Sequence, residues 1–466
     1  MSVNDTSHSG NQPFYGRDGS FVICNGEIYN SEELKEKYLR EFEFISSSDC
    51  EVILPLYKLK GISCIAELQG EFALIIYDAS LRRVVIARDA VGVRPLYISC
   101  DTEGALFVGS ELKSIPFGNA NHFPPGHIAC VELSKVVEWS CFNDNKEIAK
   151  NKTNISFDES VESLHSAISK SVKQRLKSDV PLGCFLSGGI DSSAVAALAA
   201  KFSDRRISTF TLRIDGLVNE DAYYARKVAE YIGSDHHEIT TNLDEIFSLI
   251  DEVIFISETF NFEMIPNLIL LYLVARYVST HTLVKVILDG TGPDEMLGGY
   301  WFFKDAPTPE DFEEETVKQL TEMHRTELLG DRVVSHFGLE MRYPYLDKVV
   351  KDIVLQLPVE FKTHVEHGSE KYILRKSMER YLPSEIAWRK KLGMTHGAGV
   401  NFENIFDQEI RRRLGTDTAE EAHERILGTE TYYKNVFFSK FPNAHNVECN
   451  VTASKWRASD PLAIWR

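Results

Sequence analysis

Hydrophobic and polar residues alternate over short runs in the first third of the chain, with turns between the runs. These runs are rich in β-branched and aromatic residues and lie at residues 21–30, 71–80, 82–89, 95–100 and 104–110. Such a pattern predicts an antiparallel β domain with few helices. A polar, lysine-rich stretch follows, which is typical of a linker between domains. We therefore place a first domain at residues 1–145 and a linker at residues 146–157.

The period of the pattern changes at residue 158. Apolar residues recur at helical spacing from Val161 to Leu176, directly behind the acidic Asp158 and Glu159. Strand-like and helical stretches then alternate up to about residue 290, and the last third is mostly helical and charged. Strands separated by helices predict βαβ units and a parallel sheet. The second domain, residues 158–466, is therefore expected to have an α/β fold.

Composition limits the partners of the protein. The 466 residues include 51 basic and 69 acidic side chains, so the net charge is −18. This balance disfavours nucleic acid and anionic membranes, because both need basic residues to replace counterions. The most apolar run, residues 264–278, is shorter than a bilayer span, and the start lacks an apolar signal core. The eight cysteines are scattered, which is typical of a reducing compartment. We expect a cytoplasmic protein, with a homodimer as a further hypothesis.

The clearest motif is LSGGIDSS at Leu186–Ser193, between an apolar strand and an apolar helix. Glycines after a strand let successive backbone N–H groups point at one anion, and the helix adds its positive N-terminus. Asp191 offers a hard oxygen ligand for Mg²⁺. The motif is not a Walker A loop, and the simpler alternative is a Gly-Gly turn into a serine-capped helix. The strand–loop–helix context favours a site for a metal-bound pyrophosphate.

The SGGIDS sequence resembles the pyrophosphatase loop of ATP-cleaving, AMP-forming ligases, and further motifs are similar to those of the asparagine synthetase family. They follow the family order and are NGEIYN at Asn25–Asn30, SDCEVIL at Ser48–Leu54, ARDAVGVRPLY at Ala87–Tyr97, DEMLGGY at Asp294–Tyr300, GLEMRYPYLD at Gly338–Asp347 and KWRASDP at Lys455–Pro461. The resemblance implies an α+β, glutamine amidotransferase-like antiparallel sandwich before an adenine nucleotide α-hydrolase-like α/β domain. It also implies a ligase that uses ATP and Mg²⁺ to adenylate the carboxylate of an amino acid, which ammonia or an amine then attacks.

The same resemblance assigns roles to residues of the second domain. Asp191 and Asp294 would share Mg²⁺, while Lys371 and Lys391 would approach the phosphates and the charge that develops during amide formation. The residues expected to hold ATP are Leu186, Ser187, Gly188, Gly189, Asp191, Ser192, Leu212, Gly290 and Gly292. Without the resemblance, each lysine would be interpreted as a solvated surface residue and Asp294 as a turn or helix-cap residue.

Relatives of this kind begin with a cysteine that hydrolyses glutamine, with the free α-amine as its base. This chain begins Met1-Ser2, and none of its eight cysteines stands at that position. We therefore expect no glutaminase activity. The positions that correspond to glutamine-binding residues would be vestigial, and they are Asn25, Gly26, Glu27 and Asp49.

Two stretches depart from the asparagine synthetase pattern near the expected substrate pocket. Pro266 replaces an arginine of a Thr-Thr-x-Arg-Ala-Ser stretch, which removes a bidentate partner for a carboxylate. Thr291 replaces a glutamate, and residues 389–399 look more like the β-lactam and carbapenam synthetases. Those relatives close an internal amide with a tyrosine–glutamate base. Their tyrosine stands where this chain has Thr291, and Glu327 is a candidate for the glutamate, so the sequence does not support this base as a pair. Aspartate and a specialised, cyclising amino acid both stay open as the substrate, as does a non-catalytic relative that binds ATP.

Overall fold

The computed structural model describes residues 3–116, 120–132, 135–363, 369–390, 397, 399, 402–415, 422–444, 446–447 and 449. The chain divides into two compact units. The first unit contains Met1–Asn145, Lys177–Val180 and Pro442–Val447, and the second contains Lys146–Leu176, Pro181–Phe441 and Glu448–Arg466.

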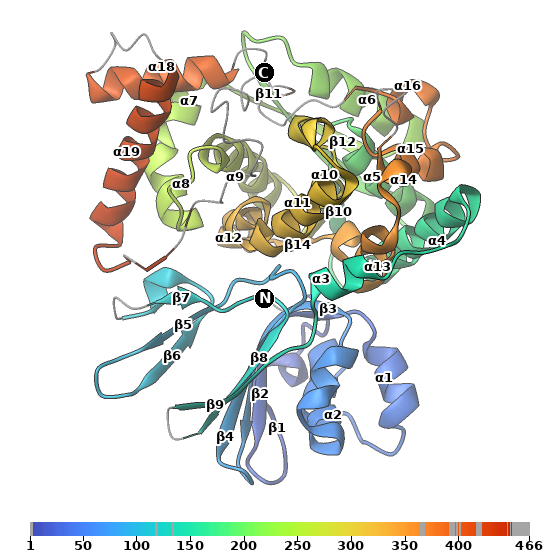
Figure 1. Ribbon diagram of the computed structural model, residues 1–466, viewed down its shortest axis with the longest axis vertical. Helices are drawn as coiled ribbons and strands as arrows, with labels where there is room; N and C mark the ends of the chain where they lie inside the picture. Colours follow the sequence, from blue (N-terminus) through green and yellow to red (C-terminus); the bar gives the residue numbers. More distant parts are fainter. Residues whose placement is uncertain are drawn as a thin grey trace. The chain divides into compact units, whose positions relative to one another are not determined.

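The first unit is built on a six-stranded antiparallel sheet with the strand order β1-β2-β3-β4-β8-β9 (Figure 1). Its strands are β1 (Phe14–Tyr15), β2 (Phe21–Ile28), β3 (Gly70–Asp78), β4 (Arg83–Arg88), β8 (His127–Glu132) and β9 (Lys135–Cys141). A second sheet, of order β6-β5-β7, contains β5 (Tyr97–Cys100), β6 (Leu106–Gly109) and β7 (Asn121–His122). Two helices, α1 (Ser31–Tyr38) and α2 (Ile53–Lys60), complete the unit. The predicted antiparallel fold is confirmed.

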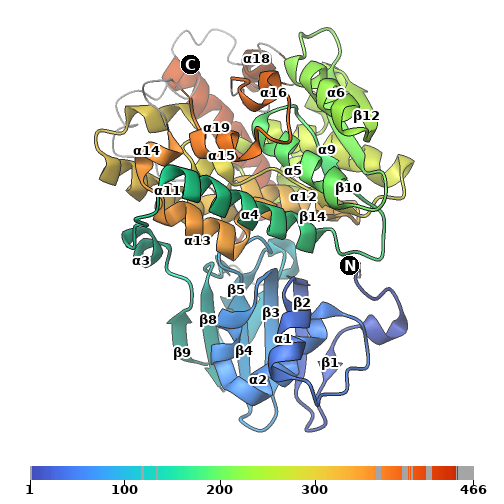
Figure 2. The same cartoon turned by 90° about the vertical axis from the view of Figure 1, so that its right-hand side faces the viewer.

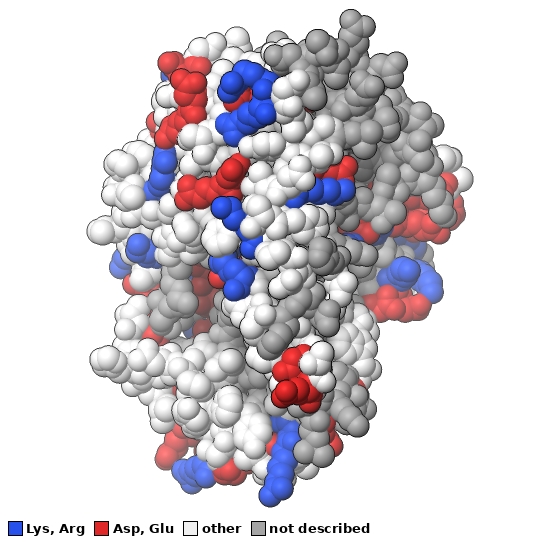
Figure 3. All heavy atoms as spheres, turned by 90° about the vertical axis from the view of Figure 1, so that its left-hand side faces the viewer, with Lys and Arg blue, Asp and Glu red and all other residues white. Residues whose placement is uncertain are grey.

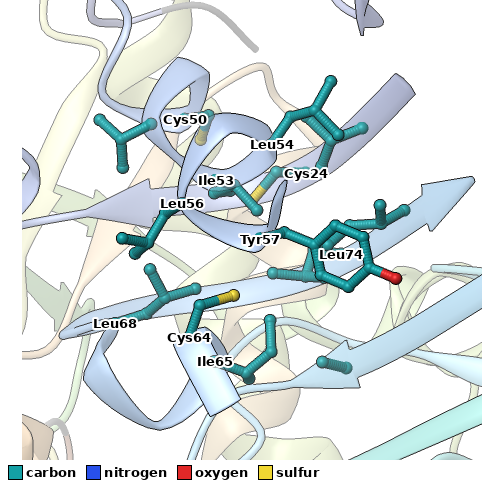
Figure 4. Packing of buried hydrophobic residues seen from close by; sticks show 14 of the residues in the cluster. Cys24, Cys50, Ile53, Leu54, Leu56, Tyr57, Cys64, Ile65, Leu68 and Leu74 are labelled. Carbon is teal, nitrogen blue, oxygen red and sulfur yellow. The ribbon is translucent and has the colours of Figure 1, made fainter. Parts of the chain in front are cut away.

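Alternation along the strands of the large sheet creates two apolar layers. Leu74 and Ile76 of β3 belong to a buried cluster with Ile53 and Leu56 of α2, so the helices cover this face (Figure 4). Ala73, the residue before Leu74, belongs to a second buried cluster. Residues of the smaller sheet pack against this second cluster. The unit is therefore a layered sandwich with helices on one side and a second sheet on the other.

Burial also decides the chemistry of the thiols. None of the eight cysteines, all of which lie in the described part of the chain, forms a disulfide, in agreement with their scattered spacing. Burial raises the pKa of the Cys64 and Cys184 thiols to about 12, because the thiolate would lose its hydration. These two side chains are packing residues rather than nucleophiles.

The second unit contains a five-stranded parallel sheet with the order β12-β11-β10-β13-β14, which confirms the predicted α/β fold. Its strands are β10 (Leu182–Phe185), β11 (Ser208–Ile214), β12 (Asp235–Thr241), β13 (Val286–Leu288) and β14 (Glu340–Arg342). The chain runs outward from β10 to β12 and then returns to β13 on the other side of β10. This reversal between β10 and β13 is a topological switch point, where parallel sheets bind ligands at the carboxyl ends of their strands.

Helices surround this sheet (Figures 1 and 2). The helix predicted at the start of the domain, α4, begins with a capping box between Ser156 and Glu159, and α6 ends at the left-handed Gly233. The helices after α2 are α3 (Asn145–Lys150), α4 (Phe157–Arg175), α5 (Ile190–Phe202), α6 (Glu220–Ile232), α7 (Leu243–Ser248), α8 (Ile250–Ser257), α9 (Met264–His281), α10 (Pro293–Met296), α11 (Pro309–Glu322), α12 (Gly330–His336), α13 (Lys348–Gln356), α14 (Val359–Lys362), α15 (Tyr372–Met378), α16 (Ser384–Ala387), α18 (Phe402–Leu414) and α19 (Ala422–Lys440).

Charged residues are interspersed on the face shown in Figure 3, where acidic and basic side chains lie in small neighbouring groups. On α18, Arg412 and Glu409 form an ion pair of 2.7 Å. Among the helices in the described part of the chain, none has the length and apolarity that a membrane span requires.

Candidate active site

The loop Leu186–Gly189 joins β10 to α5 and is held by its own side chains. The Ser187 backbone N–H donates to the Ser192 hydroxyl over 3.1 Å, and the two hydroxyl oxygens lie 3.0 Å apart. Gly188 has a φ of +75°, and a Cβ at this position would lie 2.5 Å from the backbone nitrogen of Ala225. Only glycine fits here. The loop therefore presents its backbone at the N-terminus of α5, where anions bind favourably.

A second loop, residues 289–292, follows β13 and lies directly against the first. A Cβ on Gly290 would lie 2.7 Å from the backbone nitrogen of Ser192, so the two loops are in close contact. The Asp289 carboxylate accepts a hydrogen bond of 2.9 Å from the Thr291 N–H, which shapes the turn before α10. Gly290 is thus placed beside the loop that follows β10, as parallel strand order requires. A Cβ on Gly292 would instead lie 2.9 Å from Leu346 and 3.1 Å from Tyr345.

Lys371 brings the two predicted metal ligands together. Its ammonium contacts a carboxylate oxygen of Asp191 and lies 2.7 Å from Asp294 Oδ1. The lysine side chain is fully buried, and its backbone is left-handed with a φ of +56°, which is unfavourable for a residue other than glycine. Three residues that are distant in sequence therefore converge at the carboxyl ends of β10 and β13.

The donor set at this point suits a magnesium ion. Asp191 and Asp294 both contact one cationic group, so a single ion can reach both carboxylates. Asp191 Oδ1 is buried and has no hydrogen-bond partner, which leaves an oxygen ligand available. Within the described ranges no group of three or more His, Cys, Asp or Glu side chains could hold a metal ion. Mg²⁺ commonly takes one or two carboxylates and completes its shell with phosphate oxygens and water, so these residues fit it.

Two arginines, Arg375 and Arg389, line the same pocket as Asp191. Arg389 forms an ion pair of 2.7 Å with Asp221, donates to the Ser187 carbonyl over 3.2 Å, and lies 4.2 Å from the ring centre of Tyr224. The pocket lining consists of Ser187, Gly189, Ile190, Asp191, Asp221, Arg375, Arg389 and Lys390. The sequence analysis missed Asp221 and Arg389. The basic cluster around Arg389 could have indicated the arginine, but Asp221 resembles an ordinary residue of a helix's first turn.

Lys391 and Leu212 were also predicted from the sequence as site residues. Lys391 lies outside the described residues, as does the KWRASDP segment at Lys455–Pro461. Leu212 is buried near the end of β11, whose last residue is Ile214.

Tyr300 and two glutamates form a partly buried polar cluster next to Asp294, with Glu295 its most buried member. The Tyr300 hydroxyl donates to Glu327 over 2.9 Å and also hydrogen-bonds with the Glu295 carboxyl group. The Thr326 hydroxyl donates a hydrogen bond to the second carboxylate oxygen of Glu327. Burial, together with the charges of Glu327 and Asp294, raises the pKa of Glu295 to about 8. The sequence analysis named Glu327 alone, because nothing in the sequence pairs it with Tyr300.

The residues that depart from the family pattern have clear local roles. Phe260 and Asn261 belong to the stretch before Pro266 that departs from the asparagine synthetase pattern. Asn261 Oδ1 accepts hydrogen bonds from the backbone N–H groups of Glu263 and Met264, so it shapes the turn that precedes α9. Phe260 is buried with its ring centre 5.2 Å from that of Phe437. Pro266 lies in the first turn of α9, where a missing N–H costs little.

The four positions that the sequence predicts to be vestigial glutamine-binding residues lie in the first unit. Glu27 is buried and accepts a hydrogen bond from the Asn4 side chain, while buried Asp49 accepts one from the Ile28 backbone N–H. A Cβ on Gly26 would lie 1.9 Å from the Glu71 carbonyl oxygen, and Asn25 is exposed on β2. Both carboxylates are thus engaged within the unit.

Comparison with known proteins gives matches over nearly the whole chain. The asparagine synthase family model matches residues 163–314 and 304–457, and the glutamine amidotransferase domain model matches residues 1–151. The glutamine-hydrolysing asparagine synthetase B of Escherichia coli (strain K12) is 32% identical, covering 96% of this chain and 84% of that protein. The corresponding enzyme of Gallus gallus is 34% identical, covering 95% and 85%. The NH3-dependent NAD synthetase of Campylobacter jejuni aligns with 14% identity and a TM-score of 0.27, covering 62% and 96%, and this likeness carries no argument.

Proposed function

Because this chain belongs to the asparagine synthase family, we propose that it is an AMP-forming ligase that joins a carboxylate to ammonia or an amine. The family supports ATP-dependent amidation in general. The observation that carries the specific proposal is the convergence of Asp191, Asp294 and Lys371 beside the phosphate loop. A non-catalytic relative would have no reason to keep a buried lysine in a strained backbone between two carboxylates.

In the first step, the substrate carboxylate attacks the α-phosphate of ATP, and pyrophosphate leaves. The backbone of Leu186–Gly189 and the N-terminus of α5 would bind the leaving phosphates, with Arg389 positioned by Asp221 beside the same pocket. Asp191 and Asp294 would hold Mg²⁺, which when bound supplies positive charge to the leaving pyrophosphate. We propose that Lys371 and Lys391 stabilise the negative charge that increases in this step and the next.

In the second step, ammonia or an amine attacks the acyl carbon of the acyl-adenylate and must lose a proton, and the acyl–phosphate bond breaks to release AMP. We propose that Glu327 accepts this proton, with Tyr300 orienting its carboxylate through the 2.9 Å hydrogen bond. A tyrosine–glutamate pair supports a second candidate function, which is intramolecular amide formation on a specialised amino acid. The replacement of the family's arginine by Pro266 supports the same candidate, because aspartate would lose a bidentate partner.

We propose that the first unit does not hydrolyse glutamine. Glu27 and Asp49, two of the positions that would bind it, already hydrogen-bond within the unit. Incubation with glutamine should release no glutamate above the rate of a heat-inactivated sample, and appreciable release would contradict the proposal. Free thiols and an acidic composition support a cytoplasmic location.

Pyrophosphate release from ATP and Mg²⁺ tests the main proposal. Release that depends on aspartate and ammonium supports asparagine formation, and product mass spectrometry should then show the amide. Release with another amino acid and no ammonium, with loss of one water from that acid, supports the intramolecular alternative. Absence of release with every amino acid tested would exclude a ligase and leave an ATP-binding relative.

A further inference from the structure

The two carboxylates proposed to hold magnesium already have a cationic partner in this chain. The Lys371 ammonium contacts Asp191 and lies 2.7 Å from Asp294 Oδ1, and its side chain is fully buried. Magnesium requires carboxylate oxygens at about 2.0–2.1 Å. An ammonium and a magnesium ion cannot both bind directly between the same two carboxylates, because they would overlap and repel each other.

The surrounding chain fixes the lysine backbone at this place. Lys371 adopts a left-handed conformation immediately before α15, and its carbonyl accepts a hydrogen bond of 3.0 Å from the Arg375 N–H. Arg375 in turn donates to the carbonyls of Ala387 and Arg389 over 2.7 Å and 2.9 Å. Because the backbone is anchored through Arg375, we expect a change in the ammonium position to come from side-chain rotation.

Gly299 provides the room that the ammonium needs. A Cβ on this residue would lie 2.0 Å from Asp294 Oδ1 and 2.2 Å from Lys371 Cε. The lysine stem therefore passes along the glycine backbone to reach the carboxylate pair. Lys371 therefore has a strained backbone, a side chain that runs along a glycine, and complete burial. Strain of this kind persists only where the surrounding structure maintains it, which indicates that the ion pair is a specific feature of the site.

We propose that Lys371 competes with the divalent metal for Asp191 and Asp294, so that metal entry displaces its ammonium from the carboxylates and frees it to pair with phosphate oxygens. The proposal uses the metal role of these aspartates given under the proposed function. In this arrangement the lysine balances part of the carboxylate charge and lowers the affinity for a metal ion that arrives without nucleotide. Metal and nucleotide phosphates then bind more favourably together than separately.

Binding of Mn²⁺ in the absence of nucleotide, measured by isothermal titration calorimetry and by loss of the free-ion electron paramagnetic resonance signal, tests this competition. Removal of the competing charge in Lys371→Met or Lys371→Gln should tighten Mn²⁺ binding on the order of tenfold, within the 5–150-fold range typical of coupled sites. Lys351→Met is the matched control, because Lys351 is also fully buried and pairs with Asp352 over 2.7 Å. The control should leave Mn²⁺ affinity unchanged.

The same experiment distinguishes competition between Lys371 and the metal from a role of Lys371 that favours metal binding. If Lys371 instead held the carboxylates in place for the metal, both variants would bind Mn²⁺ more weakly, and unchanged or weaker binding overturns the proposal. Thermal unfolding identifies a variant that does not fold, and Lys371→Gln, which retains a hydrogen-bonding side chain, decides the result if the methionine variant fails. Adding Asp294→Asn to Lys371→Gln should remove the gain in affinity, and a retained gain would place the metal elsewhere. The Mn²⁺ titration contains neither the amino-acid substrate nor ATP, so its result does not depend on ligase activity. If the separate assay showed no pyrophosphate release, the ligase proposal would fail while the Mn²⁺ result would stand.

Discussion

Gly299→Ala tests the geometry of the site with a single methyl group. The new Cβ would lie 2.0 Å from Asp294 Oδ1 and 2.2 Å from Lys371 Cε, whereas real Cβ contacts are essentially never below 3.0 Å. The aspartate oxygen must therefore withdraw by about 1 Å, and the lysine stem by nearly as much. Misplacement of a reacting group by about 1 Å can cost about 100-fold in rate, which corresponds to about 2.7 kcal/mol. We expect pyrophosphate release to fall by this factor.

The assay follows pyrophosphate from ATP and Mg²⁺ with the amino acid that the wild type uses, and thermal unfolding is measured alongside. Gly428→Ala in α19 is the matched control, since its Cβ would make only an ordinary 3.5 Å contact with Leu414. Alanine is favoured over glycine in a helix by up to about 1 kcal/mol, so this control should keep both activity and stability. A Gly299→Ala enzyme with more than half of the wild-type rate would refute the steric reasoning.

Three further predictions concern individual side chains. Asp191→Ala should abolish pyrophosphate release because it removes the ligand with the unpartnered buried oxygen, and a variant that keeps most activity would refute the metal role. Tyr300→Phe and Glu327→Gln should slow amide formation about 100-fold while ATP–pyrophosphate exchange continues, and an equal loss of exchange would exclude a role confined to proton transfer. Burial, aided by the nearby charge of Lys152, lowers the pKa of Lys362 from 10.5 to about 7. The unfolded chain therefore binds one more proton than the folded chain between pH 7 and 10.5, so this group makes stability rise with pH across that window. Lys362→Met should lose this contribution in thermal melts at pH 7 and pH 9, and identical pH slopes for the two proteins would contradict the assignment.

Local sequence patterns were sufficient for most of the architecture. The short alternating runs predicted the antiparallel first unit, and the change to helical spacing predicted α4 and the parallel sheet that follows it. The glycines of the phosphate loop indicated a special backbone, and Gly188 indeed has a positive φ and no space for a Cβ. These features are readable because strand and helix periods, caps and turns are set by residues close together in the chain.

The sequence by itself determined which residue types could carry the chemistry, but only the tertiary structure decided which of them meet. Lys371 and Asp191 are 180 positions apart. Their contact depends on a parallel sheet in which the chain adds strands on one side of β10 and then on the other. The pairing of Arg389 with Asp221 and of Glu327 with Tyr300 likewise has no local signal. The physical reason is that convergence of side chains follows from strand order and helix packing, which are non-local. A surface-type residue such as lysine becomes a buried counter-ion only when distant segments enclose it.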